Sequence, residues 1–135
     1  MASDPMLKDK VVVVTGAGGG IGRDFAHAMA AKGAKVVVND VGASVSGEGK
    51  DAGPAQKVVD EIKAKGGTAV ANTDSVAEWE SANRIIKTAI DTFGRIDVVV
   101  NNAGILRDRF FFNMSIEEWK AVIDVHLNGS FYVAR

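Results

Sequence analysis

The stretch Val11-Val12-Val13-Val14-Thr15-Gly16-Ala17-Gly18-Gly19-Gly20-Ile21-Gly22 decides the fold of this 135-residue chain. Four consecutive valines are typical of a parallel strand covered on both faces, because β-branched side chains favour strands and neither face has to be polar. The glycines that follow form a strand-to-helix turn in which backbone N–H groups and a helix N-terminus can approach a diphosphate. The stretch therefore predicts the first strand and turn of an α/β fold that binds a phosphorylated ligand.

The rest of the chain alternates between strand and helix patterns. Predicted strands cover residues 11–14, 36–38, 68–71 and 96–100, and predicted helices cover 21–32, 54–65, 76–93 and a last segment opened by the capping box at Ser115. Each strand–helix unit has roughly thirty residues, the length of a right-handed crossover. We therefore expect a three-layer Rossmann-type α/β sandwich with a parallel sheet, truncated after the helix that follows the fourth strand. Residues 1–135 would form a single dinucleotide-binding domain, incomplete at its C-terminus.

Helical spacing predicts which faces of the helices are buried. We expect the inward residues to be Ile21, Phe25, Ala28 and Met29 in the first helix, and Ile85, Ile86, Ala89 and Ile90 in the third. In the last helix, Gly129 is expected to cause a kink or an interruption.

Composition limits the function classes. The chain is 47% hydrophobic and 24% charged, as in globular proteins, and its 16 Lys and Arg against 17 Asp and Glu give no charge excess for nucleic acid or a membrane surface. Because it has no cysteine, disulfides, a thiolate nucleophile and a cysteine-ligated zinc are excluded. With His27 and His126 as the only histidines, we expect no metal site. A cytoplasmic location and small-molecule partners are expected.

The glycines do not fit the pattern Gly-x-Gly-x-x-Gly but do fit Thr-Gly-x-x-x-Gly-x-Gly from Thr15 to Gly22. The residues predicted to contact a cofactor here are Gly16, Gly18, Gly20, Ile21 and Gly22. A P-loop is excluded, because no Lys followed by Ser or Thr comes after the last glycine. A tight turn that serves only close helix–strand packing remains an alternative.

Asp40 follows the second predicted strand, where a carboxylate can accept hydrogen bonds from ribose hydroxyls and repel a 2′-phosphate. No Lys or Arg lies inside the glycine-rich turn or beside Asp40. We therefore predict NAD rather than NADP as the cofactor. The alternative is that Asp40 only caps its own loop.

With the glycine-rich turn, Asp40, Asp74-Ser75-Val76 and Asn101-Asn102-Ala103-Gly104 in this order, the chain resembles a classical short-chain dehydrogenase/reductase over essentially its whole length. The resemblance implies that Asp74 and Ser75 lie at the adenine. It also implies that Asn101 braces the centre of the sheet, and that Ala103 and Gly104 line the ribose.

A narrower resemblance points to the substrate. Residues 39–42, 71–72 and 102–109, and the loop from Ser46 to Asp51, are similar to the (3R)-hydroxyacyl-CoA dehydrogenase part of peroxisomal multifunctional enzymes and bacterial relatives. This similarity implies a 3-hydroxyacyl thioester or a similar secondary alcohol or ketone as substrate, and a homo-oligomeric full-length protein. The run Phe110-Phe111-Phe112 could line an acyl-binding cleft or anchor its loop beneath Trp119.

The chain departs from the family pattern at two places. In the Asn-Leu-x-Gly motif His126 replaces the Asn, so this candidate auxiliary catalytic residue could relay a proton or could simply pack in its helix. The catalytic Ser and Tyr-x-x-x-Lys of the family are absent, and the only tyrosine is Tyr132, three residues before the end of the sequence. We therefore expect the cofactor-binding half of an oxidoreductase, inactive alone. We also expect association through an exposed last helix carrying Leu127, Phe131 and Val133.

Two other functions fit parts of the pattern. A non-catalytic NAD-binding or regulatory module would explain the missing Tyr-x-x-x-Lys. An S-adenosylmethionine-dependent methyltransferase also has a glycine-rich turn after its first strand, but the Asn101–Gly104 motif and the position of Asp40 argue against it.

Overall fold

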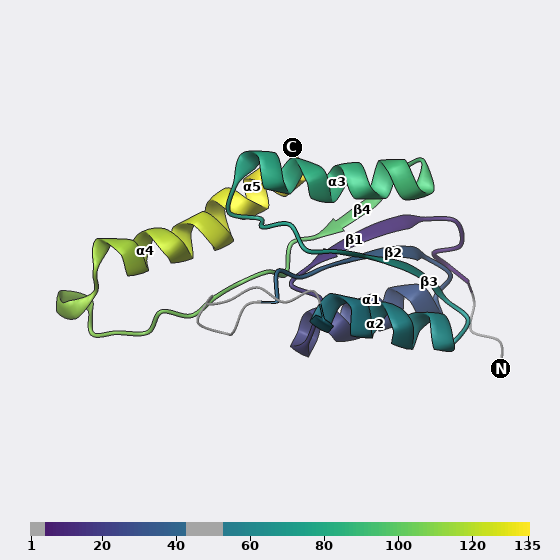
Figure 1. The fold of residues 1–135 in the computed structure, drawn as a ribbon, viewed down its shortest axis with the longest axis horizontal. Helices are drawn as coiled ribbons and strands as arrows, with labels where there is room; N and C mark the ends of the chain where they lie inside the picture. Colours follow the sequence, from purple (N-terminus) through teal and green to yellow (C-terminus); the bar gives the residue numbers. More distant parts are fainter. Residues whose placement is uncertain (1–4, 43–52) are drawn as a thin grey trace.

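A computed structural model describes residues 5–42 and 53–135 as a sheet with helices on both faces (Figure 1). The four parallel strands are β1 (Val11–Thr15), β2 (Lys35–Asn39), β3 (Thr68–Asn72) and β4 (Val98–Val100), in the spatial order β3-β2-β1-β4. Val13 of β1 pairs with Val37 on one side and with Val99 on the other. The predicted parallel sheet is confirmed, with β4 at one edge.

The helices form the outer layers of the sandwich. As Figure 1 shows, α1 (Gly20–Ala31) and α2 (Gly53–Ala64) cover one face of the sheet, and α3 (Trp79–Phe93) covers the other together with the short α5 (Gly129–Ala134). Between β4 and α5 lie a 3-10 turn (Phe111–Asn113), α4 (Ile116–Ile123) and a π-helical turn (Asp124–Asn128). The predicted three-layer arrangement is confirmed.

The core consists of two apolar clusters, one on each face of the sheet. Alternate side chains of a strand point to opposite faces, so Val12 and Val14 pack toward α1 and α2 while Val11 and Val13 pack toward α3. Each of these four valines is at most 1% exposed. The continuous apolar run was therefore a correct sign of a strand buried on both faces.

Two predicted helix faces need correction. In α1 the buried residues are Gly22 and Ala26, whereas Ile21 is 70% and Phe25 41% exposed. Ala28 is exposed too. The helix lies so close to the β1 turn that only small side chains fit beneath it, and of the predicted face only Met29 packs on the core.

In α3 the inward positions are Ser81, Ala82, Ile85 and Ala89, with Ile86 packed at their edge. Ile90 is 43% exposed, so its predicted burial is wrong. It lies five residues after Ile85, about 140° further around the helix, which takes it off the buried face.

The segment from 106 to 123, called the arm below, extends away from the sheet (Figure 1). The predicted capping box at its helix is confirmed, since Ser115 Oγ accepts from the Glu118 N–H and Glu118 Oε2 accepts from the Ser115 N–H. No residue of α4 is buried. The capping box therefore stabilises the start of α4 without core packing.

The end of the described chain differs from expectation at Gly129 and Val133. Gly129 has a helical φ of −61°, and the irregularity lies before it, in the π turn. Val133 is only 2% exposed because α5 packs on α3, whereas Leu127 and Phe131 are 64% and 58% exposed as expected.

Candidate functional site

The predicted site residues meet at the carboxyl ends of the strands. The chain leaves β1 toward α1 on one face of the sheet and leaves β4, its neighbour, toward the other face, so the order β3-β2-β1-β4 reverses direction between these two strands. Crevices at such reversal points are where open α/β sheets bind ligands. The segments that directly follow β1, β3 and β4, and residues 40–42 after β2, surround this point.

Two glycines of the turn after β1 serve packing. Gly16 has a φ of +63°, and a Cβ there would lie 2.8 Å from Ala103 Cα. A Cβ on Gly22 would collide with the Gly16 carbonyl and the Asn102 amide. The packing interpretation of the glycine-rich turn therefore applies at these two positions.

Gly19 and Gly20 face open space within the described part of the chain, since a Cβ at either position would have no atom of another segment within 4 Å there. Gly19 is the N-cap of α1 and has no side chain to cap the helix. The first N–H groups of a helix lack intrahelical acceptors, and no acceptor within the described residues is paired with the N–H of Gly20, Ile21 or Gly22. The turn therefore offers uncapped amides at the positive end of a helix dipole.

The Asp40 carboxylate is held by its own surroundings. Its Oδ2 accepts from the Gly18 N–H at 2.8 Å and its Oδ1 accepts from the Gly42 N–H at 2.7 Å. A Cβ on Gly18 would lie 2.8 Å from the Asp40 carboxyl carbon, so a side chain at this position would displace the carboxylate. Asp40 thus caps its loop, and each oxygen retains a second lone pair for another donor.

A polar clamp joins the ends of β1 and β4. Thr15 Oγ1 accepts from the N–H of Asn102 at 3.1 Å and of Ala103 at 3.0 Å. Asn102 Nδ2 donates to the carbonyls of Thr15 and Gly16 at 3.0 and 3.1 Å. The bracing expected of Asn101 falls to Asn102, because Asn101 is exposed and makes one 3.4 Å bond to the Ser130 carbonyl.

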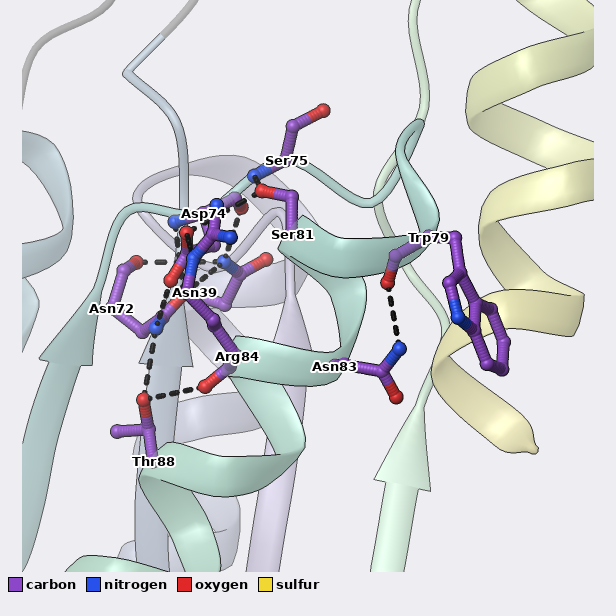
Figure 2. A network of polar contacts seen from close by, with 9 residues as sticks. All are labelled: Asn39, Asn72, Asp74, Ser75, Trp79, Ser81, Asn83, Arg84 and Thr88. Carbon is purple, nitrogen blue, oxygen red and sulfur yellow. Dashed lines mark hydrogen bonds and ion pairs between the residues drawn. The ribbon is translucent and has the colours of Figure 1, made fainter.

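A polar network fixes the loop after β3 (Figure 2). Asp74 Oδ1 accepts from Arg84 Nε at 2.7 Å, and Oδ2 accepts from Asn72 Nδ2 at 2.9 Å. Asn39 Nδ2 donates to Asn72 Oδ1 and to the Asp74 carbonyl, both at 2.8 Å. The Asp74 carboxylate therefore belongs to a network that the sequence analysis missed. The only sign of this network in the sequence was an asparagine at the end of each of two buried strands.

Ser75 lies in the same loop, where its backbone N–H donates to Ser81 Oγ at 2.8 Å and its own Oγ accepts from the Ala77 N–H at 3.1 Å. Next to it, Val76 is buried against Gly129. The whole triplet is thus held in one conformation by side chains of α3 and by the close approach of α5.

His126 approaches the segment after β4. Its Nε2 lies 3.1 Å from the Ile105 nitrogen and 3.0 Å from the Ile105 oxygen. Gly104 leaves room for the ring, since a Cβ there would lie 2.7 Å from His126 Cε1. The histidine is partnered, as one of the two interpretations expected, yet it remains exposed.

The three phenylalanines of the arm do not anchor it. Phe110, Phe111 and Phe112 are 76%, 85% and 83% exposed, and the rings of Phe110 and Phe112 stack on each other at 5.8 Å. Because Trp119 is itself 53% exposed, the anchoring interpretation is wrong. The acyl-cleft interpretation stays a prediction.

The described part of the chain contains no group of three or more His, Cys, Asp or Glu side chains that could hold a metal ion. In the same residues no helix has the length and apolar character needed to cross a membrane. The loop from Ser46 to Asp51, part of the narrower resemblance, lies outside the described residues.

Comparison with known proteins identifies the family. Residues 10–135 match the short chain dehydrogenase family. The chain belongs to this family. The expected family resemblance is confirmed, and the methyltransferase alternative is not favoured.

The relatives include multifunctional enzymes. The chain is 58% identical over 135 residues to peroxisomal multifunctional enzyme type 2 of Mus musculus, covering all of this chain and 18% of that protein. It is 53% identical over 135 residues to the peroxisomal hydratase-dehydrogenase-epimerase of Saccharomyces cerevisiae, of which it covers 15%. A short chain dehydrogenase from Mycobacterium avium superposes with a TM-score of 0.86 at 56% identity, over 94% of this chain and 45% of that one. The chain thus spans less than half of each of these relatives.

Proposed function

We propose that this chain is the NAD-binding half of a short-chain oxidoreductase that transfers hydride between NAD and a secondary alcohol or ketone. The observation that carries the proposal is the uncapped N-terminus of α1 at the point where the sheet reverses direction. Bound NAD would supply the hydride acceptor for oxidation of the alcohol. The chain's own residues would bind and orient it.

The pyrophosphate would lie against the amides of Gly20, Ile21 and Gly22. Anions are stabilised at such a position both by direct hydrogen bonds and by the helix dipole. The open space beside Gly19 and Gly20 gives the phosphates room. The described residues therefore fit a dinucleotide.

The preference for NAD over NADP would come from Asp40. Its carboxylate keeps free lone pairs for ribose hydroxyls and would repel a 2′-phosphate. Arg23, the first cation after the turn, is bound to Glu61 of α2 at 2.8 Å. Among the described residues, a 2′-phosphate would therefore meet the Asp40 carboxylate before an unpaired cation.

The substrate we propose is a 3-hydroxyacyl thioester or a similar secondary alcohol, and the full-length protein would be a homo-oligomer. Support comes from the resemblance of residues 39–42, 71–72 and 102–109 to the (3R)-hydroxyacyl-CoA dehydrogenase part of peroxisomal multifunctional enzymes. The 58% identity of the chain to one such multifunctional enzyme is consistent with this resemblance. We expect the 135 residues to bind NAD without turnover. In this family a tyrosine followed four residues later by a lysine removes the hydroxyl proton, and the sequence holds no such pair. A cytoplasmic location is part of the same proposal.

The test is calorimetric titration of NAD into the wild type and Gly19→Ala. Gly19 has an extended φ of −168° and open space at its Cβ, so alanine is compatible with the fold. We expect Gly19→Ala to stay folded with a stability loss of at most about 1 kcal/mol, since alanine is a poorer N-cap than glycine. It should bind NAD about tenfold more weakly, because the methyl group occupies the space of the phosphates. Gln56→Ala, on the exposed side of α2, is the control and should bind as the wild type does. Equal affinity in the wild type and Gly19→Ala would contradict the proposal.

A further inference from the structure

Arg107 differs from every other arginine of the chain. All six arginines lie within the described residues. Five of the guanidinium groups have a partner: these are the ion pairs Arg23–Glu61, Arg84–Asp74, Arg95–Asp97 and Arg109–Glu118, and the contact of Arg135 with the ring of Trp79 at 5.4 Å. The side chain of Arg107 has no hydrogen bond or ion pair with any described residue, and its Nε is buried.

A buried N–H of a charged group without an acceptor is unusual. Arginine keeps its charge throughout the physiological pH range, and buried polar atoms nearly always have a hydrogen-bond partner. An exception can mark backbone strain or the position of a ligand. Within the described chain, Asp9 is the only residue other than glycine with a positive φ, so strain of this kind does not account for Arg107. The free N–H therefore indicates the position of an anionic ligand.

Arg107 is held at the edge of the candidate cofactor crevice by the segment before it. Ala103 donates its N–H to Thr15 Oγ1 at 3.0 Å, and the backbone of Ile105 lies 3.0 to 3.1 Å from His126 Nε2. Arg107 comes two residues after Ile105, so their Cα atoms are at most about 7 Å apart. Figure 1 shows the arm leaving the sheet from the carboxyl end of β4. A ligand that extends from the crevice along the arm would therefore pass Arg107.

The surroundings of Arg107 combine one free cation with an exposed apolar surface. Leu106 is 57% exposed, and the stacked rings of Phe110 and Phe112 are 76% and 83% exposed. The planar guanidinium group matches a phosphate with two parallel hydrogen bonds. An acyl thioester whose carrier ends in a phosphate has both the apolar and the anionic part that this region of the arm can bind.

We propose that Arg107 binds the phosphate of the phosphopantetheine carrier to which the acyl group of the substrate is attached. The inference rests on the proposed function and extends it from the reacting carbon to the carrier. Coenzyme A and an acyl carrier protein share this phosphate. The contact would therefore serve either carrier and does not depend on the adenosine part of coenzyme A.

The test uses two ligands that differ only in the phosphate, acetoacetyl-phosphopantetheine and acetoacetyl-pantetheine. Each is titrated by calorimetry into the chain with saturating NAD. We expect the wild type to bind the phosphorylated ligand about tenfold more tightly, and Arg107→Ala to bind both ligands equally. Arg107→Lys should keep part of the difference, because it retains the charge without the planar fork. Lys120→Ala, which removes an exposed cation from α4, is the matched control and should behave as the wild type does.

Acetoacetyl-CoA distinguishes the phosphate that both carriers share from the other phosphates of coenzyme A. We expect Arg107→Ala to weaken acetoacetyl-CoA by the same factor as acetoacetyl-phosphopantetheine. A loss confined to acetoacetyl-CoA would overturn the assignment to the shared phosphate.

Titration of NAD alone separates this inference from the proposed function. We expect Arg107→Ala to bind NAD and to melt as the wild type does, because its side chain bonds to no described residue. If the wild type binds NAD but neither thioester, or if Arg107→Ala still favours the phosphorylated thioester, the role of Arg107 is overturned and the proposed function stands. If Arg107→Ala weakens NAD as much as the thioesters, the role is likewise overturned. If the wild type does not bind NAD, both are overturned.

Discussion

In β1 the valines from 11 to 14 are at most 1% exposed, whereas in the arm Phe110, Phe111 and Phe112 are each more than three-quarters exposed. Both regions are apolar in sequence. The strand is covered by α1 and α2 on one face of the sheet and by α3 on the other, whereas the arm has no such cover among the described residues. Apolar sequence thus predicts burial only where the surrounding chain supplies the partner.

Removing apolar side-chain volume from each region tests whether only the strand depends on burial. Ile85→Ala empties a fully buried position under α3 and should destabilise by about 2–5 kcal/mol, while Phe111→Ala should change stability by no more than about 0.5 kcal/mol. Urea denaturation measures both. A large cost for Phe111→Ala would mean that the arm packs on the body in solution.

The clamp at the carboxyl end of β4 marks the boundary between the well-packed sheet and the exposed arm. Asn102→Ala loses two bonds to the Thr15 and Gly16 carbonyls and should cost about 1–3 kcal/mol. Asn101→Ala, one residue earlier and exposed, is the matched control and should be within about 0.5 kcal/mol of wild type. Equal effects in the two variants would refute the assignment of the brace to Asn102.

At the amino end of β4, the Asp97 carboxylate binds Arg95 and the backbone of β1. The hydrogen bond from Arg95 and a second from the Val11 N–H lower the pKa of Asp97 from 3.8 to about 2. A carboxylate with a lowered folded-state pKa stabilises the protein above its unfolded-state pKa and loses that stabilisation as the pH falls through the folded-state value. We therefore expect Asp97 to contribute stability that is complete above about pH 4 and lost toward pH 2.

Thermal melts from about pH 2 to 6 measure this contribution. Asp97→Asn should melt lower than wild type at about pH 6, and the difference should shrink as the pH approaches 2 because the wild-type carboxylate then becomes neutral too. Asp91→Asn is a suitable control, since Asp91 makes one exposed ion pair with Lys87 on α3. A pH-independent gap between Asp97→Asn and wild type would contradict the assignment.

The smallest effect on stability is expected from making the arm polar. Phe111→Ser combined with Trp119→Ser should leave the melting temperature nearly unchanged and reduce self-association, because large exposed apolar patches drive contacts between copies. Light scattering over a concentration series measures association. Phe25→Ser, a partly exposed site on α1, is the control. A wild-type chain that stays monomeric throughout would contradict the expectation.

The sequence predicted the sheet well because strand burial and crossover length follow directly from the order of residues. The valine runs placed β1, β2 and β4, and the roughly thirty-residue spacing required parallel neighbours. The face of α1 was predicted incorrectly because close approach to the turn favours Gly22 and Ala26 over Ile21 and Phe25. Such proximity depends on tertiary packing, which periodicity does not contain.

The sequence predicted which segments come together at the candidate site. It predicted less well which side chains hold these segments in place. All the predicted segments meet at one edge of the sheet, but Thr15, Asn39, Asn72 and Asn102 make most of the hydrogen bonds that shape it. Which of the two adjacent asparagines, Asn101 or Asn102, turns toward β1 depends on where β4 ends. The predicted strand ended at Val100 as observed, but the family resemblance implied Asn101 as the brace, whereas Asn102 makes the bonds to β1 and its turn.

Titration of NAD and NADP into the wild type and Asp40→Ala measures whether the candidate site binds a dinucleotide with Asp40 at its ribose. Loss of the Gly18 contact would weaken both nucleotides alike, so the ratio of the two affinities isolates the charge of the carboxylate. We expect the wild type to prefer NAD and Asp40→Ala to reduce this preference at least about tenfold. An unchanged ratio in Asp40→Ala, or no binding of either nucleotide by the wild type, would contradict it.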